Sequence, residues 1–164
     1  MLKLSKLTDY AVVVLIRLSE SERATGGCGC ADAVQTSPGI AAATGVPEPT
    51  VAKVLKALAG ANLVVSQRGA RGGYRLARPI TAIAVADVIS AVDGPIALTA
   101  CVDGGAGDCD MQNMCAVRGR WDLVNEAIRG ALTGITLADM REASIPLAFR
   151  ALPALAPRQT TAAE

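Results

Sequence analysis

The 164-residue sequence contains no histidine. The protein therefore has no imidazole to act as a general base near neutral pH or to bind a metal. A cysteine nucleophile usually relies on such a base, and no catalytic motif is present. We expect that the protein is not an enzyme.

Long hydrophobic runs are also missing. The longest, AVVVLI at residues 11–16, is far shorter than the roughly 20 apolar residues that cross a bilayer. The opening MLKLSKLTDY lacks the basic, apolar and small-residue regions of a secretory signal peptide. We therefore expect a cytoplasmic protein with no membrane partner.

The five cysteines are odd in number and unevenly spaced. This arrangement does not fit a disulfide framework, and in a reducing compartment it favours metal or redox chemistry. Cys28 and Cys30 form a CGC pair that we interpret as solvent-facing loop residues, with a redox role as the alternative. The other three lie in a run rich in glycine and aspartate: Cys101, Cys109 and Cys115.

The net charge of +1 hides an asymmetry between the two halves. Residues 1–80 carry ten Lys or Arg against five Asp or Glu, whereas residues 81–164 carry six against ten. The first half is therefore the candidate for contact with a polyanion.

The first half begins with a predicted helix. Ser5 is a suitable N-cap, and we expect the helix to run through about Leu18. Its YAVVVLIRL run is apolar on most sides, so periodicity does not separate a helix from a strand, although length favours a helix. Residues 21–36 are small, polar and glycine-rich and predict a loop.

Two further helices are predicted after this loop, joined by a tight turn. Ser37 and Pro38 supply a cap and a first turn for a short helix through Ala43, which Gly45 closes. The third helix, in PTVAKVLKALAGANLV, places two lysines away from its apolar stripe, which is the plan of a helix-turn-helix. The stripe consists of Val51, Val54, Leu55 and Leu58.

A hairpin follows the third helix. Two strand-like pieces, LVVSQ and GYRLA, flank the glycine-rich tip RGARG. Arg68 and Arg71 at this tip are placed to reach phosphates or a narrow minor groove. The combination predicts a winged helix-turn-helix that binds double-stranded DNA.

Four segments resemble a known family: LSKLTDYA, GVPEPTVAKVLKALAGANLV, RGARGGYRLARP and AIAVADVISAVDGPI. They look like the winged-helix bacterial regulators that include IscR, NsrR and CymR. The resemblance covers residues 1–142, and LSKLTDYA and GPIALTAC favour the branch of SUF iron–sulfur assembly regulators. It implies a fold that is mainly α with a small β-wing: a DNA-binding domain at 1–80, and a cluster-binding loop and long dimerisation helix at 81–142. Residues 143–164 lie beyond the resemblance, and we interpret them as a flexible tail.

The resemblance also implies a cofactor. In cluster-binding members three cysteines precede the dimerisation helix, and Cys101, Cys109 and Cys115 occupy that place. They would hold an iron–sulfur cluster, either [2Fe–2S] or [4Fe–4S]. The chemistry agrees, because such clusters bind thiolates and glycine lets a loop wrap around them. Neither gap is a CxxC, so a zinc site is a poorer match.

The fourth ligand must come from elsewhere. IscR-like members have a histidine three residues after the third cysteine, where this chain has Arg118. Similar nitric-oxide-sensing relatives use an aspartate of the other subunit at the place matching LTDYA, so we expect Asp9 to complete the site. The alternative is that Asp9 only occupies the first helical turn, where a negative charge is favourable.

The start of the third helix is expected to enter the major groove. Ala52 stands where an IscR-like regulator has a base-reading glutamate, so the operator is expected to differ. Lys56 lies one turn further along the lysine-bearing face. The residues expected to contact DNA from this helix are Glu48, Pro49, Thr50, Lys53 and Lys56.

From Ala116 the spacing predicts a long amphipathic helix that Gly134 ends. Packing of its stripe against a second copy would let two winged helices read a palindromic operator, whereas packing within the monomer is the alternative. TLADM predicts a short final helix capped by Thr136. The stripe consists of Val117, Trp121, Val124, Ile128 and Leu132.

These features together predict a homodimeric repressor that senses an iron–sulfur cluster, redox or nitric oxide and controls iron–sulfur assembly genes. The alternative is a CymR-type regulator that binds no cluster and responds to a metabolite or a partner protein.

Overall fold

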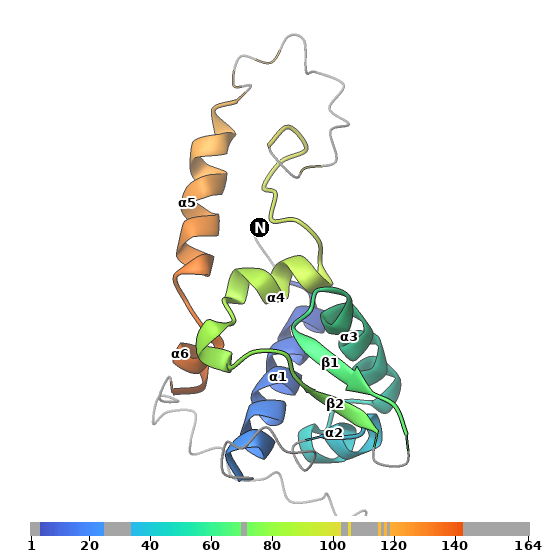
Figure 1. Cartoon of the computed structure of the whole chain (residues 1–164). Helices are drawn as coiled ribbons and strands as arrows, with labels where there is room; N and C mark the ends of the chain where they lie inside the picture. Colours follow the sequence, from blue (N-terminus) through green and yellow to red (C-terminus); the bar gives the residue numbers. More distant parts are fainter. Residues whose placement is uncertain are drawn as a thin grey trace, which may run out of the picture.

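The computed structural model describes residues 4–24, 34–69, 72–102, 105, 115, 117 and 119–142. Within these residues the chain folds into α-helices and one two-stranded antiparallel sheet (Figure 1). The predicted class, mainly α with a small β-wing, is confirmed. Several residues named above lie outside this part of the chain: Cys28, Cys30, Arg71, Cys109, Arg118 and 143–164.

The first helix, α1 (Lys6–Ala24), has the predicted cap but a different end. The Oγ of Ser5 accepts a hydrogen bond from the Thr8 N–H at 3.2 Å, which confirms Ser5 as the N-cap. The predicted end near Leu18 is wrong. No glycine or proline occurs before Gly26, so nothing in the sequence stops the helix earlier.

The second helix, α2 (Ser37–Thr44), begins one residue away from the predicted cap. Thr36, not Ser37, has the extended backbone of an N-cap, and its Oγ1 accepts a hydrogen bond from the Gly39 N–H at 3.2 Å. Gly45 ends the helix as predicted. Its φ of +73° is a left-handed conformation that glycine adopts without strain.

The third helix, α3 (Glu48–Gly60), buries one face in the core. It packs against α1 and α2, and the same core contains Leu15 and Leu18 of α1. Each such buried side chain contributes roughly 1.5–3 kcal/mol to folding. The predicted stripe is confirmed, because four side chains have no exposed surface: Val51, Val54, Leu55 and Leu58.

The wing consists of β1 (Val64–Gln67) and β2 (Gly73–Leu76). The strands pair antiparallel, with Val64 opposite Leu76. Both of these side chains are buried against the helices, so the inner end of the hairpin belongs to the core. The wing was therefore predicted correctly in position and type.

A short bridge that the sequence did not predict extends this sheet. The Gln35 N–H donates to the Tyr74 carbonyl at 2.9 Å, and the Tyr74 N–H donates to the Gln35 carbonyl at 2.8 Å. Gly73 permits this approach, because a Cβ at that position would lie 2.5 Å from the Gln35 carbonyl oxygen. The chain that enters α2 is thereby fixed to the wing.

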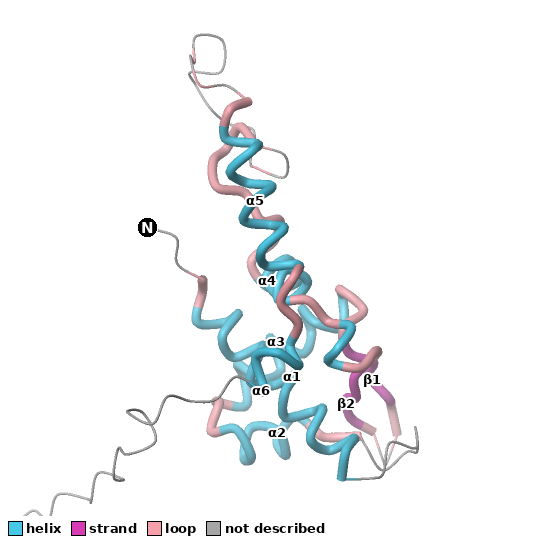
Figure 2. Tube along the Cα trace, turned by 90° about the vertical axis from the view of Figure 1, so that its left-hand side faces the viewer, coloured by secondary structure: helices cyan, strands magenta, loops and turns pink. Residues whose placement is uncertain are grey.

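The second half of the chain begins with the 3-10 turn η2 (Ile80–Ala82) and α4 (Val85–Val92). The latter packs against α1, α3 and α5. Helix α5 (Trp121–Thr133) projects away from the winged-helix body, and α6 (Leu137–Glu142) returns to it and packs on η2 and α1 (Figures 1 and 2). None of the described helices combines the length and the hydropathy of a bilayer-spanning segment.

Two predictions for this half have different outcomes. The long helix was expected from about Ala116, but α5 begins at Trp121, because Gly119 with φ of +74° interrupts the helical path before it. The cap of α6 is confirmed. The Oγ1 of Thr136 accepts a hydrogen bond from the Asp139 N–H at 3.2 Å, and the Asp139 carboxylate accepts one from the Thr136 N–H at 2.8 Å.

Candidate nucleic-acid interface and cysteine segment

The outer face of α3 carries most of the residues that the sequence singled out for DNA. The buried stripe fixes the rotation of α3 about its axis, and this outer face therefore points to solvent. Thr50 is half-buried on it, and Ala52 offers only an exposed methyl group. The other side chains are exposed: Glu48, Pro49, Lys53 and Lys56.

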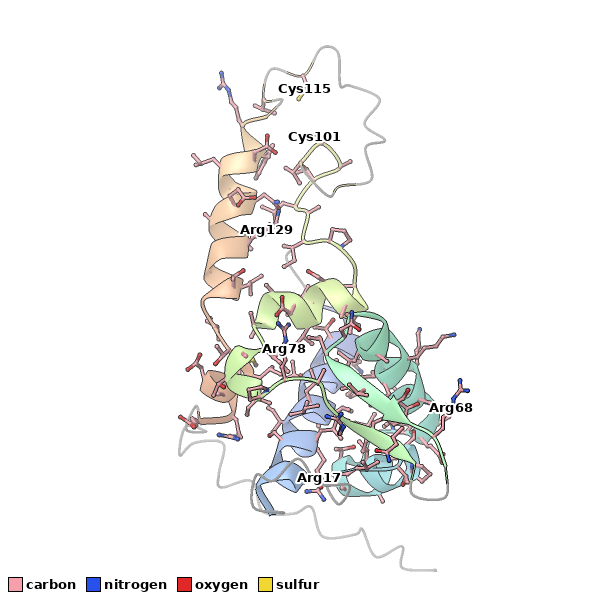
Figure 3. The ribbon with its side chains drawn as sticks, in the orientation of Figure 1. Arg17, Arg68, Arg78, Cys101, Cys115 and Arg129 are labelled. Carbon is pink, nitrogen blue, oxygen red and sulfur yellow. The ribbon has the colours of Figure 1, made fainter. Side chains whose placement is uncertain are left out.

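Three cations of this region lack an acidic partner within the part of the chain that the structure describes. Lys53, Lys56 and Arg68 form no ion pair with any residue that the structure describes. Arg68 directly follows β1, and its side chain points away from the body of the molecule (Figure 3). Exposed, unpaired cations on a helix and an adjoining wing suit contact with phosphates. Its predicted companion, Arg71, lies outside the described residues.

Cys101 and Cys115 have free, half-buried thiols. Figure 3 places both near the N-terminal end of α5, away from the winged-helix body. In the described part of the chain, no group of three or more Cys, Asp and Glu side chains is close enough to hold a metal ion. The predicted ligand set, however, includes Cys109, which lies outside that part. A cavity of about 310 Å³ adjoins one thiol and is lined by Cys101, Asp122, Asn125 and Glu126.

Asn125 connects α5 to the chain that leads to the cysteines. Its side chain is 2% exposed. The side-chain Oδ1 accepts a hydrogen bond from the Leu98 N–H at 3.1 Å, and the Nδ2 donates to the Ile96 carbonyl at 3.2 Å. One amide therefore pairs two backbone groups of residues 94–101, which we call the cysteine segment. Three residues after Leu98, the Sγ of Cys101 lies 3.3 Å from the Thr99 hydroxyl.

Asp9 lies on the exposed side of the first turn of α1. The structure does not bring it into a metal-binding group with other described residues of the same chain. Its neighbour Thr8 is 2% exposed, and the Thr8 hydroxyl donates to Asp93 at 2.7 Å. Asp93 is the residue at which α4 ends.

The Asp93 carboxylate receives two more hydrogen bonds, from the Ser5 hydroxyl at 2.6 Å and from the Ser5 N–H at 3.3 Å. Burial alone would raise the pKa of Asp93, but the hydrogen bonds from Ser5 and Thr8 outweigh it and hold the pKa below its ordinary value. The ionised carboxylate also faces the first turn of α1, where a negative charge is favourable.

The sequence analysis did not single out Asp93, Thr99 or Asn125. Asn125 left a faint signal, as a polar residue beside Val124 on the stripe of the predicted helix. Asp93 comes just before Gly94, a pattern typical of any turn. Their partners lie far away in the sequence, so the sequence does not indicate the contacts.

A winged helix-turn-helix with exposed cations on the outer face of α3 and on the wing is a DNA-binding fold. The family model described as "Rrf2: Iron-dependent Transcriptional regulator" matches residues 4–143. The chain belongs to the Rrf2 family. A helix-turn-helix-type transcriptional regulator of Mycobacterium tuberculosis is similar to it, with 33% identity over 146 residues, which cover 88% of this chain and 84% of that one.

Solved structures of other Rrf2-type regulators have the same fold. CymR, the global cysteine regulator of B. subtilis, has a TM-score of 0.62 and 27% identity, covering 88% of this chain and 100% of that one. IscR of T. potens has a TM-score of 0.57 and 30% identity, covering 85% of this chain and 86% of that one. The predicted group of regulators is thus confirmed. This Rrf2 protein is a transcriptional regulator and not an enzyme.

Proposed function

We propose that this Rrf2 protein is a homodimeric repressor that holds an iron–sulfur cluster and controls iron–sulfur assembly genes according to the state of that cluster. The ligands are Cys101, Cys109 and Cys115, with Asp9 of the partner subunit as the fourth. The observation that carries the proposal is the free, half-buried Cys101 thiol in a segment that side chains tie to both α1 and α5.

The donors at this end of the molecule fit a cluster. Cys101 and Cys115 are not joined in a disulfide, and thiolates are the ligands that iron–sulfur clusters prefer. The carboxylate of Asp9 is a harder ligand for iron than a thiolate, which makes one corner exchangeable. When bound, a [2Fe–2S] or [4Fe–4S] cluster supplies a centre that oxidation or nitric oxide alters. The protein orients the thiols, and a displacement of the cysteines moves the helices that contact their segment.

DNA is bound by the winged-helix domain at residues 1–80, in the bacterial cytoplasm. The start of α3, with Glu48, Pro49, Thr50 and Lys53, enters the major groove of a palindromic operator. Lys56 and the wing residues Arg68 and Arg71 contact phosphates. Because Ala52 presents a methyl group at a base-reading position, the operator differs from an IscR-type site.

The homodimer forms through α5, in the part of the chain at 81–142 that also carries the cysteines. Trp121 and Val124 on the stripe of this helix are each 42% exposed, although both are large and apolar. A second copy of the helix would bury them. Two winged helices would then face successive major grooves of one duplex.

Iron and acid-labile sulfide per chain, with the visible spectrum, test the proposal on protein purified without oxygen. We expect near-stoichiometric cluster that is lost when Cys101, Cys109 or Cys115 is replaced by alanine. A protein with both Cys28→Ala and Cys30→Ala is the matched control, and it should keep the cluster. Protein that stays colourless and iron-free after reconstitution would contradict the proposal.

A cluster-free regulator of CymR type is the second candidate. It is favoured by one observation, that a CymR structure shares the fold of this chain with a TM-score of 0.62. For this candidate we expect protein without iron that still protects an operator fragment. The iron measurement therefore separates the two candidates while leaving the DNA-binding role common to both.

A further inference from the structure

One carboxylate joins the end of α4 to the start of α1. Asp93 accepts hydrogen bonds from the Ser5 N–H, the Ser5 hydroxyl and the Thr8 hydroxyl, the two hydroxyl contacts being 2.6 and 2.7 Å long. The Ser5 hydroxyl also caps α1 by accepting a hydrogen bond from the Thr8 N–H. The cap and the carboxylate thus form one network, which we call the Asp93 clasp.

The clasp lies at the end of α4, where this helix packs against the DNA-binding domain and the cysteine segment begins. Gly94 follows with φ of +91° and turns the chain away from α4 toward Cys101. Further along, Asn125 fixes Ile96 and Leu98 to α5. The segment is therefore held by side chains at two points, by Asp93 immediately before its start and by Asn125 of α5 at its middle.

Movement at the clasp has a direct path to the DNA-binding surface. α4 packs against both α1 and α3, and α1 packs against α3. Thr8 is almost fully buried, so the first turn of α1 does not shift without disturbing the hydroxyl contact to Asp93. A displacement of residues 94–101 that moves Asp93 therefore also moves α1 and, through α1, helix α3.

We propose that Asp93 is the positioning residue through which the cysteine segment acts on the DNA-binding domain. This inference rests on the proposed function, because it needs a segment whose position depends on a bound cluster. Loss of the Asp93 clasp uncouples the two parts: the cluster still binds to its thiols, and α3 still binds DNA, but neither responds to the other.

The experiment measures DNA affinity in the cluster-loaded and cluster-free forms of the full chain, by fluorescence anisotropy. The probe is a duplex that the wild-type protein selects from a random pool. For the wild type we expect the two affinities to differ about five-fold or more. For Asp93→Ala and for Thr8→Val we expect unchanged iron per chain but affinities that agree within about two-fold.

The matched control is Asp87→Ala, which removes the same side chain from the other end of α4. Asp87 accepts hydrogen bonds from Arg78 at 2.6 Å and from the Ala84 N–H at 3.3 Å, so its loss weakens α4 without touching the clasp. We expect it to keep the wild-type affinity ratio. Hydrogen exchange of residues 50–58 in α3 is the second readout, and its dependence on cluster loading should disappear only in the clasp variants.

The outcomes separate the two hypotheses. Asp93→Ala protein that holds iron and keeps the wild-type affinity ratio overturns the inference and leaves the proposed function intact. Loss of the ratio in Asp87→Ala as well would mean that α4 only stabilises the fold, which also overturns it. Wild-type protein without iron, or with equal affinities, overturns the proposed function and the inference together. If Asp93→Ala does not fold, Thr8→Val decides by the same criteria.

Discussion

The side-chain oxygen of Asn125 accepts a hydrogen bond from the Leu98 N–H, and these two residues are 27 positions apart in the sequence. The Asn125 amide also donates a hydrogen bond to the Ile96 carbonyl. In a β-sheet a neighbouring strand would pair such backbone groups, and in this irregular segment the Asn125 side chain pairs them instead. The position of residues 94–101 thus depends in part on one buried amide.

Replacement of Asn125 by alanine should destabilise the protein by about 1–3 kcal/mol, because it leaves two partly buried backbone groups unpaired. Urea unfolding measures the change. Glu126→Ala is the matched control: among the described residues, this exposed neighbour forms one surface ion pair, with Arg129, so its loss should cost within about 0.5 kcal/mol. Equal effects of the two substitutions would show that the amide contacts do not stabilise the fold.

Replacement of Arg68 by alanine should weaken binding to all duplexes by a similar factor. A phosphate contact carries no sequence information, so the slope of log affinity against log salt should fall by about 1. Arg129→Ala on α5 removes the same charge far from α3 and should leave the slope unchanged. An unchanged slope for Arg68→Ala would refute a role for the wing in phosphate binding.

Substitution of Val124 by glutamate should convert the dimer to a monomer, because it places a charge on the apolar stripe of α5. Leu123 is the preceding residue, about 100° around the same helix from Val124 and off the apolar stripe, and it is 80% exposed. Leu123→Glu is therefore the control and should remain dimeric. Light scattering after size exclusion measures the mass, and a monomeric wild type would contradict dimerisation through this stripe.

Stability should fall in acid partly through Asp93. The pKa of Asp93 is lower in the folded protein than its ordinary value of 3.8. The ionised carboxylate therefore stabilises the folded state above pH 3.8, and this stabilisation is lost as the pH falls through the folded pKa. Between about pH 5 and about pH 3, the unfolding free energy of Asp93→Asn should therefore decrease less than that of the wild type. Ser90→Ala, an exposed change on α4, should follow the wild type.

If the protein holds the proposed cluster, Thr99→Val should lower the reduction potential of that cluster. A hydroxyl that donates to the Cys101 sulfur stabilises the reduced, more negative form, and valine removes this donor without changing the shape of the side chain. Thr99→Ser retains the hydroxyl and should keep the potential close to that of the wild type. Redox titration followed by visible absorption compares them, and equal potentials in all three proteins would exclude this contact.

The local elements were accessible from the sequence because short-range rules determine them. The stripe of α3, the wing and the caps at Ser5 and Thr136 follow from spacing and from the residues next to each element. The errors also have local causes. Thr36 and Ser37 are adjacent and equally able to cap α2, and only the backbone conformation decides between them.

The contacts around the cysteine segment were not accessible in this way. Asp93 forms hydrogen bonds with Ser5 and Thr8, which precede it in the sequence by 88 and 85 positions. No pattern in a single sequence joins an aspartate to a serine or threonine at that separation. Asn125 gives a similar lesson, because its partners are backbone groups, which every residue has. Burial and packing of the helices create these pairs, and local propensity does not.

The bridge between Gln35 and Tyr74 has a consequence for how this regulator tolerates change over evolution. Its two backbone hydrogen bonds hold the chain against the wing just before α2 begins. The preceding helix, α1, ends at Ala24, so the chain is fixed at both ends of the interval between Ala24 and Gln35. Insertions or deletions between these two anchors need not alter the register of α2 or of the strands. The glycine-rich stretch that includes Cys28 and Cys30 falls within this interval, so it is a place where related chains are free to differ in length.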